Sequence, residues 1–568
     1  MKKISFTRLL DLLPGLFVWS VIIGVFVGSY FFPIVVAYFI ILFNVYWVLK
    51  TVSMNYYYIR SFIMLRAWCL FNWKGRAEAL TGKSEISAFL INEYHFISTM
   101  SLRDIFEKTH EKLNFEKKRF ITLPYWIELP IFLIQKRVAI WLIQSEINHF
   151  NKQKETDIIW DYKKIKHFII IPFAKEPYSV LKPTVDRLAK QDCDTKSIVV
   201  VLATEKACPT GQDIASQLTK EYEGVFADII TTVHELKTDE IRGKSANMWY
   251  AATVAKQKID NEKMNEDFIT MTSCDCDSQF PTNYFSVLTY EFCKNPLRYR
   301  KYWNGSMIYY DNIWEVPFYV RVANTLFSCT ALATHSRPNM IQVSTYSGSY
   351  KLIKDIGFWT KDKIPEDWNM YFKAVFKYGK DVSVVPLFLS IFSDAAGSTT
   401  HWKSFVNQYE QVKRWSWGVS DDSWIIQNMI STRRKFSDWI SVFIKGINAT
   451  VDHFLWPLYG FVLAFGANIP PLISKPFSNT VLGNNLSPII SIILTISTIQ
   501  FLGIVLLDTE LKPKRPDNKR GFFSYILYFL EFIFMPITGI IFGSLPALDA
   551  HTRLLMGKRM EYRITEKQ

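Results

Sequence analysis

Residues 268–278 read FITMTSCDCDS, and two carboxylates follow directly where an apolar run ends. A short, continuous apolar run of this kind predicts a strand that is buried on both faces. Residues two apart in an extended chain point to the same side, so Asp275 and Asp277 are expected to share one face. Carboxylate oxygens suit Mg²⁺ or Mn²⁺ held partly by a diphosphate. A solvated turn is the alternative, because an Asp-x-Asp pair alone is common.

Strands and helices alternate around this stretch. We expect four strands, at residues 168–172, 197–202, 225–233 and 267–273. Helices are expected between them, at residues 178–190, 211–222 and 245–257. The alternation predicts a mostly parallel sheet with helices on both faces. Ligands bind such sheets at the carboxyl ends of the strands, where Glu205 would join the aspartate pair.

Charged residues also lie at the predicted starts of two helices. Lys244 follows Gly243 at a helix start, where anions collect; a solvated lysine is the alternative. Glu366 and Asp367 precede a helix predicted at residues 369–378, and acidic residues there are common as caps. The functional alternative is a general base that takes the proton of an acceptor hydroxyl.

Another helix, expected at residues 401–417, carries a polar and aromatic group on one face. Gln411, Arg414 and Trp415 are spaced i, i+3 and i+4, so they lie together. Arginine can make bidentate contacts to phosphate. Tryptophan offers a flat apolar surface of the kind on which sugar rings stack. An amphipathic helix with a surface arginine and a core tryptophan is the alternative.

In this order, the motifs resemble those of membrane-embedded family 2 glycosyltransferases, the type found in cellulose and hyaluronan synthases. That type carries an Asp, an Asp-x-Asp, a Glu-Asp or Asp, and a Gln-x-x-Arg-Trp motif. The segments that carry the resemblance are residues 171–177, 243–247, 275–277, 366–368 and 411–415. The resemblance covers residues 166–420, and several motifs in the right order are more specific than any one of them.

The resemblance implies a GT-A-type (Rossmann-like) fold and a role for each residue. Asp367 would be the catalytic base, with inversion at the anomeric carbon, and Asp275 and Asp277 would hold Mg²⁺ or Mn²⁺. Glu366 and Trp415 would bind the acceptor. The implied donor-binding residues are Pro172, Glu176, Glu205, Lys244, Asp275, Gln411 and Arg414.

The chain departs from the family at one position. The family's first aspartate, at the end of the second strand, binds the uracil base, and this chain has Glu205 there. A UDP-sugar is the expected donor, with Glu205 in place of the aspartate.

Composition favours a membrane protein with a basic cytoplasmic part. The chain has 568 residues, of which 49% are hydrophobic and 16% aromatic, and its net charge is +14. Its seven cysteines are scattered and form no disulfide framework, which favours a reducing compartment. The basic residues are dispersed and no nucleic-acid-binding motif occurs, so no nucleic-acid partner is expected.

Apolar stretches place the α/β domain between N- and C-terminal transmembrane helices. Basic residues, among them Lys2 and Lys3, flank the first two stretches, which predicts a hairpin with both ends in the cytoplasm. The predicted parts are a transmembrane hairpin (1–50), a helical cytoplasmic or interfacial region (51–165), the GT-A glycosyltransferase domain (166–418), an amphipathic interfacial helix (419–447), a transmembrane region (448–546) and a basic cytoplasmic tail (547–568).

Two apolar stretches contain interruptions. Residues 125–143 include charges that are costly inside a bilayer, so we expect a helix on the membrane surface or packed on the soluble domain. Residues 522–545 contain Glu531 and Pro536 and precede a basic tail. A re-entrant segment is expected there, because it keeps the tail in the cytoplasm.

Together these features predict a multi-pass enzyme of the plasma membrane with its catalytic domain in the cytoplasm. It would move a sugar from a nucleotide-sugar donor to a growing polysaccharide or a lipid-linked acceptor at the lipid bilayer. A non-catalytic membrane protein that binds nucleotide sugars as a scaffold is the alternative. The sequence identifies no accessory subunit.

Overall fold

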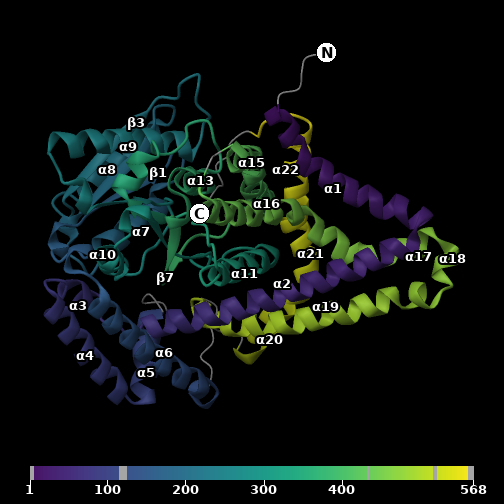
Figure 1. Ribbon diagram of the computed structural model, residues 1–568, viewed down its shortest axis with the longest axis horizontal. Coiled ribbons are helices and arrows are strands. Elements are labelled where there is room, and N and C mark those ends of the chain that lie inside the picture. The colour runs from purple at the N-terminus through teal and green to yellow at the C-terminus, as the bar shows by residue number, and fades with distance from the viewer. Residues whose placement is uncertain (1–5, 114–124, 432–433, 516–520, 561–568) are drawn as a thin grey trace.

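The computed structural model describes residues 6–113, 125–431, 434–515 and 521–560. An α/β domain lies at one end of the molecule, and long helices project from it (Figure 1). Lys2, Lys3 and residues 561–568 of the predicted basic tail lie outside the described residues.

A seven-stranded sheet forms the centre of the α/β domain. Its strand order is β3-β2-β1-β4-β6-β5-β7, and β6 runs antiparallel to both β4 and β5, whereas the other pairings are parallel. The strands are β1 (Lys166–Pro172), β2 (Ile198–Glu205), β3 (Asp228–His234), β4 (Ile269–Ser273), β5 (Lys301–Ile308), β6 (Tyr346–Ser349) and β7 (Ser383–Phe392). The predicted mostly parallel sheet is confirmed, and the sequence missed β5, β6 and β7.

The register of the three central strands brings their carboxyl ends to one edge of the sheet. Pro172, the last residue of β1, pairs with Ala203 of β2, and Ile170 pairs with Ser273 at the end of β4. The segments that follow β1, β2 and β4 therefore leave the sheet close to one another. Glu205, at the end of β2, and the aspartate pair after β4 lie on either side of β1.

Apolar residues of β1 alternate between the faces of the sheet and support helices on both. Ile169 and Ile171 belong to the core that α7 (Tyr178–Ala189), α8 (Pro209–Glu221) and α10 (Tyr284–Lys294) cover. Phe168 and Ile170 belong to a second core, covered by α9 (Lys244–Asn261). The predicted helical layers on both faces are confirmed.

Long apolar helices precede and follow the α/β domain. Figure 1 shows α1 (Phe6–Phe31), α2 (Pro33–Trp68) and α19 (Val481–Asp508) converging at the far end from the sheet, near the short helices α17 (Ile469–Ile473) and α18 (Lys475–Ser478). Within the described chain, five helical stretches are long and apolar enough to cross a membrane. They are Phe6–Phe31 (α1), Pro33–Trp68 (α2), Phe436–Ile473 (α16, Phe436–Phe465, with α17), Val481–Leu511 (α19, Val481–Asp508, and the turn after it) and Ile526–Leu555.

Two predicted boundaries fall inside continuous helices. α2 passes residue 50 without a break, and α16 passes residue 447. Tyr58, Phe62 and Leu65, in the second half of α2, are buried in the same core as β1. Each helix therefore runs without a break from the apolar helices to the α/β domain, where the sequence predicted a boundary between two parts of the chain.

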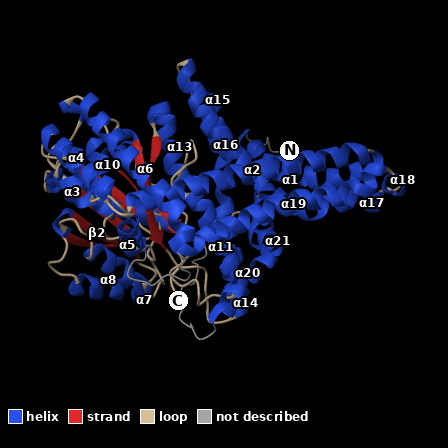
Figure 2. Ribbon diagram, turned by 90° about the horizontal axis from the view of Figure 1, so that it is seen from below, coloured by secondary structure: helices blue, strands red, loops and turns tan. Residues whose placement is uncertain are grey.

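The last apolar stretch is broken into short helices. α20 (Gly521–Glu531), a 3₁₀ turn, α21 (Met535–Gly539) and a π-helical turn precede α22 (Leu545–Leu555). Figure 1 shows α20, α21 and α22 crossing the bundle near its base, and Figure 2 shows α20 and α21 to one side of it. Glu531 accepts two hydrogen bonds of 2.7 Å from Arg321 of α11 (Phe318–Thr334). A re-entrant course stays a prediction.

Helices also fill the predicted helical region before the sheet. They are α3 (Trp73–Glu78), α4 (Lys83–Thr99), α5 (Leu102–Leu113) and α6 (Tyr125–Lys152). Phe132, Ala139 and Ile143 of α6 are fully buried in the core shared with β1. Two placements were predicted for this stretch, on the membrane surface or against the soluble domain, and the structure shows α6 packed against the soluble domain.

A buried ionic cluster joins three of these elements. Arg66 of α2 donates to Glu510 in the turn after α19, and its Nη2 lies 3.4 Å from Glu128 of α6. Its Nε donates to Gln135 Oε1 at 3.3 Å. All three charged side chains are inaccessible to solvent. Removing one partner of a buried ion pair leaves an uncompensated charge, which strongly destabilises the fold. The cluster therefore stabilises the packing of these helices against one another.

We expect Arg66→Leu to lower the free energy of unfolding by roughly 3–5 kcal/mol. Chemical denaturation of the detergent-solubilised protein, followed by tryptophan fluorescence, measures the change. Arg60→Leu, on an exposed position of the same helix, is the matched control and should change stability by less than about 0.5 kcal/mol. Equal effects of the two substitutions would contradict a structural role for the cluster.

Candidate functional site

One cavity collects every residue that the sequence predicts for the site. Its volume is about 550 Å³, and it lies at the carboxyl edge of the sheet, against α13 (Glu366–Tyr378) and α14 (His401–Ser416). The predicted residues that line it are Pro172, Glu176, Glu205, Lys244, Asp275, Asp277, Glu366, Asp367, Gln411, Arg414 and Trp415. The fold thus brings together segments that are far apart in the chain, and the role of each residue stays a prediction.

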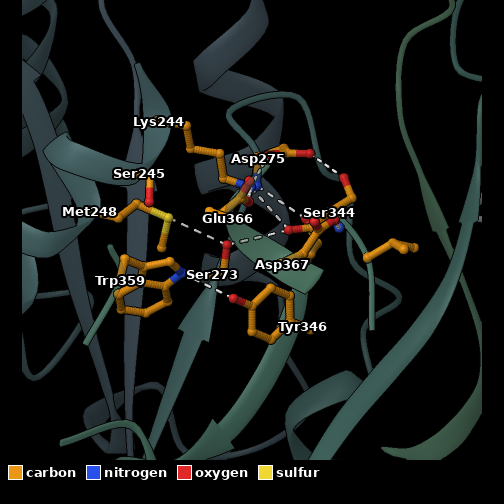
Figure 3. A network of polar contacts seen from close by, with 12 residues as sticks. Lys244, Ser245, Met248, Ser273, Asp275, Ser344, Tyr346, Trp359, Glu366 and Asp367 are labelled. Carbon is orange, nitrogen blue, oxygen red and sulfur yellow. Dashed lines mark hydrogen bonds and ion pairs between the residues drawn. The ribbon is translucent and has the colours of Figure 1, made fainter. Parts of the chain in front are cut away.

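Lys244 links the end of β4 to the start of α13. Its Nζ lies 2.7 Å from Asp275 Oδ1 and 2.6 Å from Glu366 Oε1 (Figure 3). Gly243 precedes it with a φ of 153°, which a glycine adopts easily. Burial opposes the charge, but the two carboxylates outweigh it and raise the pKa of Lys244 above its ordinary value. The amine is therefore a fixed cation between two carboxylates.

Asp367 is a carboxylate that titrates near neutrality. Removal from solvent and the neighbouring Glu366 raise its pKa from 3.8 to about 7, although Lys244 acts in the opposite direction. Its two oxygens accept hydrogen bonds from the backbone N–H groups of Trp368 (2.9 Å) and Ser344 (3.2 Å). These bonds fix the orientation of the side chain. A carboxylate with this pKa can take up a proton from a substrate at physiological pH.

The aspartate pair has a different geometry from the one predicted. β4 ends at Ser273, and a turn follows in which the Ser278 N–H donates to the Asp275 carbonyl at 3.0 Å. The chain is therefore not extended through the pair. Asp275 is 28% exposed, and its carboxylate accepts from the Ser344 hydroxyl. Asp277 is only 3% exposed and accepts from the Asp394 N–H at 2.9 Å. Both nevertheless line the cavity.

The donor set at this point fits a hard divalent cation. Two carboxylates line the cavity, and one of them, Asp275, already binds a positive charge, the ammonium of Lys244. In the described chain, no three His, Cys, Asp or Glu side chains gather into a ready-made metal cage. A metal here would take its remaining ligands from a diphosphate or water, as Mg²⁺ commonly does.

α14 presents its predicted face to the cavity. Gln411 is 4% exposed, and among the described residues its Oε1 has no hydrogen-bond partner, so a ligand donor would satisfy a buried acceptor. Trp415 packs against Tyr309 and Phe327, with ring centroids 5.6 and 5.2 Å apart. These contacts fix the indole beside Arg414.

Residues at and after the ends of β1 and β2 line another part of the cavity. Glu205 lies 3.4 Å from Arg242 Nε, and Glu176 accepts from the Ala174 N–H at 2.7 Å. Pro172 completes this part. β2 and β4 are separated by two strand spacings, or about 10 Å, so a ligand bound at Asp275 could extend to Glu205.

The prediction from the sequence did not include residues that two other segments bring to the cavity. Ser344 touches both Asp275 and Asp367, but nothing in its local sequence distinguishes it. Lys445, Asp452 and His453 of α16 also line the cavity. The sequence could have indicated these three residues, because ionisable residues within an apolar helix commonly mark a functional site.

The second half of the chain matches a glycosyltransferase family model. Residues 272–507 match the model described as Glycosyl transferase family group 2. The match begins in β4, includes Asp275, Asp367 and Arg414, and ends in α19; it covers less than half of the chain. No curated protein matches the sequence.

Solved glycosyltransferase structures are similar at low identity. A mannosyltransferase from Pyrobaculum calidifontis in complex with GDP-Man and Mn²⁺ is 12% identical, with a TM-score of 0.35, over 61% of this chain and 86% of its own. S. aureus TarS 1-349 in complex with UDP-GlcNAc is 12% identical, with a TM-score of 0.31, over 59% of this chain and 91% of its own. The observed sheet, rather than these scores, establishes the α/β fold.

We expect Lys244→Met to lower the free energy of unfolding by roughly 3 kcal/mol, because Asp275 and Glu366 lose their shared cation. Chemical denaturation in detergent measures the loss. Lys256→Met is the control, since this exposed lysine pairs with Asp260 on the surface of the same helix. It should change stability by less than about 1 kcal/mol. A loss no larger than that of the control would show that Lys244 does not hold the site together.

Proposed function

We propose that the protein is an inverting, metal-dependent glycosyltransferase that uses a nucleotide-sugar donor. The observation that carries this proposal is the meeting of Asp275, Asp367 and Arg414 around one cavity. The family match includes all three residues and supports sugar transfer. The resemblance of the motifs makes a UDP-sugar the expected donor, and the similar solved structures hold GDP-Man and UDP-GlcNAc.

The donor diphosphate would lie between the aspartate pair and α14. Asp275 and Asp277 would hold Mg²⁺ or Mn²⁺, which when bound supplies Lewis-acid stabilisation of the leaving diphosphate. Arg414 and Lys244 add cationic charge to the same cavity. Negative charge develops on the leaving group in the transition state, so fixed cations there lower the barrier. The end of the cavity at Glu205 and Pro172 would receive the nucleoside.

Asp367 would act as the general base. An acceptor hydroxyl gives its proton to this carboxylate as the hydroxyl oxygen attacks the anomeric carbon. The bond from that carbon to the diphosphate oxygen breaks, and its electron pair leaves with the nucleoside diphosphate. Attack opposite the leaving group inverts the anomeric centre. Trp415 offers a stacking surface for the acceptor sugar, and Glu366 lies beside the base.

The cavity also borders a helix that is apolar enough to cross a membrane. This supports an enzyme that acts at a membrane. The distribution of basic residues in the sequence makes the cytoplasmic face of the plasma membrane the expected side, with a growing polysaccharide or a lipid-linked molecule as the acceptor. A non-catalytic scaffold that binds nucleotide sugars is the second candidate. The raised pKa of Asp367 favours the enzyme, because binding alone does not require a base that titrates near neutrality.

We expect Asp367→Asn to reduce metal-dependent nucleotide release roughly 10²- to 10⁴-fold, because an amide cannot accept the proton. Purified membranes, a panel of nucleotide sugars and Mg²⁺ or Mn²⁺ provide the assay. Asp239→Asn, at an exposed position between β3 and α9, is the matched control and should turn over like the wild type. Turnover by Asp367→Asn at the wild-type rate would refute the catalytic proposal.

The pH dependence tests the environment of the same base. In the wild type, kcat/KM should rise about tenfold per pH unit below pH 7 and level off above it, since Asp367 is active when ionised. Glu366→Gln removes a neighbouring negative charge that raises this pKa. The acidic limb should therefore move to lower pH in Glu366→Gln. A limb that moves to higher pH would contradict the assignment.

A further inference from the structure

The cavity continues beyond the predicted site into a groove between two helices. One wall is a face of α11, lined by Phe327, Thr330, Ala331 and Thr334. The other wall is a face of α16, lined by Lys445, Asn448, Ala449, Asp452, His453 and Trp456. Both sets follow the three- and four-residue spacing of a single helical face. The transfer chemistry proposed above uses none of these residues.

The groove ends at a cluster of charges that has a positive excess. Lys50 of α2 lies 2.9 Å from Asp452 Oδ1, so this carboxylate already has a cation. Arg337, which follows α11, is 43% exposed and reaches the other oxygen of Asp452 only at 4.0 Å. Within the described chain this long contact is the one ion pair of Arg337. Its guanidinium therefore has room for an anion, and arginine suits phosphate oxygens.

A third cation, Lys445, lines the same groove. Lys445 of α16 donates to the Val382 carbonyl at 2.7 Å, and among the described residues it makes no ion pair with a carboxylate. Arg337 and Lys445 line the groove and Lys50 pairs with Asp452, so three cations stand against the one carboxylate of the α16 wall. A neutral glycan would not need this excess of positive charge, whereas a phosphate would be attracted by it.

The position of the cluster along the bundle matches the level of lipid head groups. Lys50 lies about 26 Å along α2 from Pro33, and Asp452 lies about 20 Å before Phe465 at the end of α16. The hydrocarbon core of a bilayer is about 30 Å thick. The charges therefore lie near the membrane boundary on the side of the α/β domain.

We propose that this groove binds a lipid-linked acceptor, with the acceptor's phosphate at Arg337 and its sugar hydroxyl at Asp367. This inference rests on the proposed function and selects one of its two acceptors. The sugar lies along the groove between Trp415 and α16, and the lipid chain leaves toward the bilayer. The hydroxyl oxygen forms the new bond to the anomeric carbon, its proton passes to Asp367, and the nucleoside diphosphate leaves with the electron pair of the broken bond.

Binding of polyprenyl phosphate tests the site without any donor. The full-length protein is placed in phosphatidylcholine nanodiscs, and a photoreactive polyprenyl phosphate is cross-linked at increasing concentration. We expect polyprenol, which lacks the phosphate, to compete at least tenfold more weakly than polyprenyl phosphate. Arg337→Gln should raise the apparent Kd for polyprenyl phosphate roughly 10- to 100-fold, as expected for the loss of a charged hydrogen bond. Arg337→Lys should retain part of the affinity.

Controls separate this site from a nonspecific surface arginine. Arg60→Gln, at an exposed position of α2, should bind the probe like the wild type, and thermal unfolding checks that each variant is folded. Phosphatidylglycerol and inorganic phosphate should each compete much more weakly than polyprenyl phosphate. If polyprenol or phosphatidylglycerol competes equally well, Arg337 is only a head-group-level arginine and the inference is overturned.

Two outcomes distinguish this inference from the proposed function. Wild-type protein that binds polyprenyl phosphate as expected but releases no nucleotide from any sugar donor would refute transferase activity and leave the phosphate site standing. Protein that turns over donor but delivers labelled sugar only to a water-soluble glycan, with Arg337→Gln equal to the wild type, would refute the lipid-linked acceptor alone.

Discussion

The ion pairs of Lys244 with Asp275 and Glu366 are the contact on which the candidate site depends. They join α9, the end of β4 and the start of α13, which are separated from one another along the chain. Without this cation, two carboxylates would face each other in a partly enclosed cavity, and repulsion would open the site. The same pairing holds the side chain of Glu366, the residue next to Asp367, in the cavity. Its negative charge then adds to the loss of solvent and brings the Asp367 carboxylate into the range of a useful base.

The long apolar helices pack directly against residues of the candidate site. Asp508, at the end of α19, accepts hydrogen bonds from Tyr58 of α2 and from Tyr310 after β5. The neighbouring Tyr309 packs against Trp415 in the cavity. His453 of α16 stacks on Trp368, the residue after the proposed base, with ring centroids 4.5 Å apart. A change in the helix bundle would therefore reach both the stacking tryptophan and the base through packed side chains.

Local patterns predicted the elements of the first half of the sheet well. Short apolar runs such as Phe168–Ile171 are buried on both faces, and the period of the flanking segments identified α7, α8 and α9. The later strands were not predicted because their local sequence patterns are weak. β6 has only four residues and contains Gly348, and β7 contains Pro386. Those strands pair with partners far away in the chain, so tertiary contacts decide their existence more than local preference does.

The sequence by itself determined the alternation of strands and helices, the flanking apolar helices, and the eleven residues that line the predicted part of the cavity. The alternation and the apolar helices follow from periodicity, which acts over a few neighbouring positions. The eleven residues follow from their chemistry and from the resemblance of their motifs to those of a known family. Only the tertiary structure decided that the aspartate pair lies in a turn, that Ser344 bridges Asp275 and Asp367, and that Arg337 and Asp452 line the same cavity. Those relations join residues tens to hundreds of positions apart, and only the packing of the folded chain sets the distances between them.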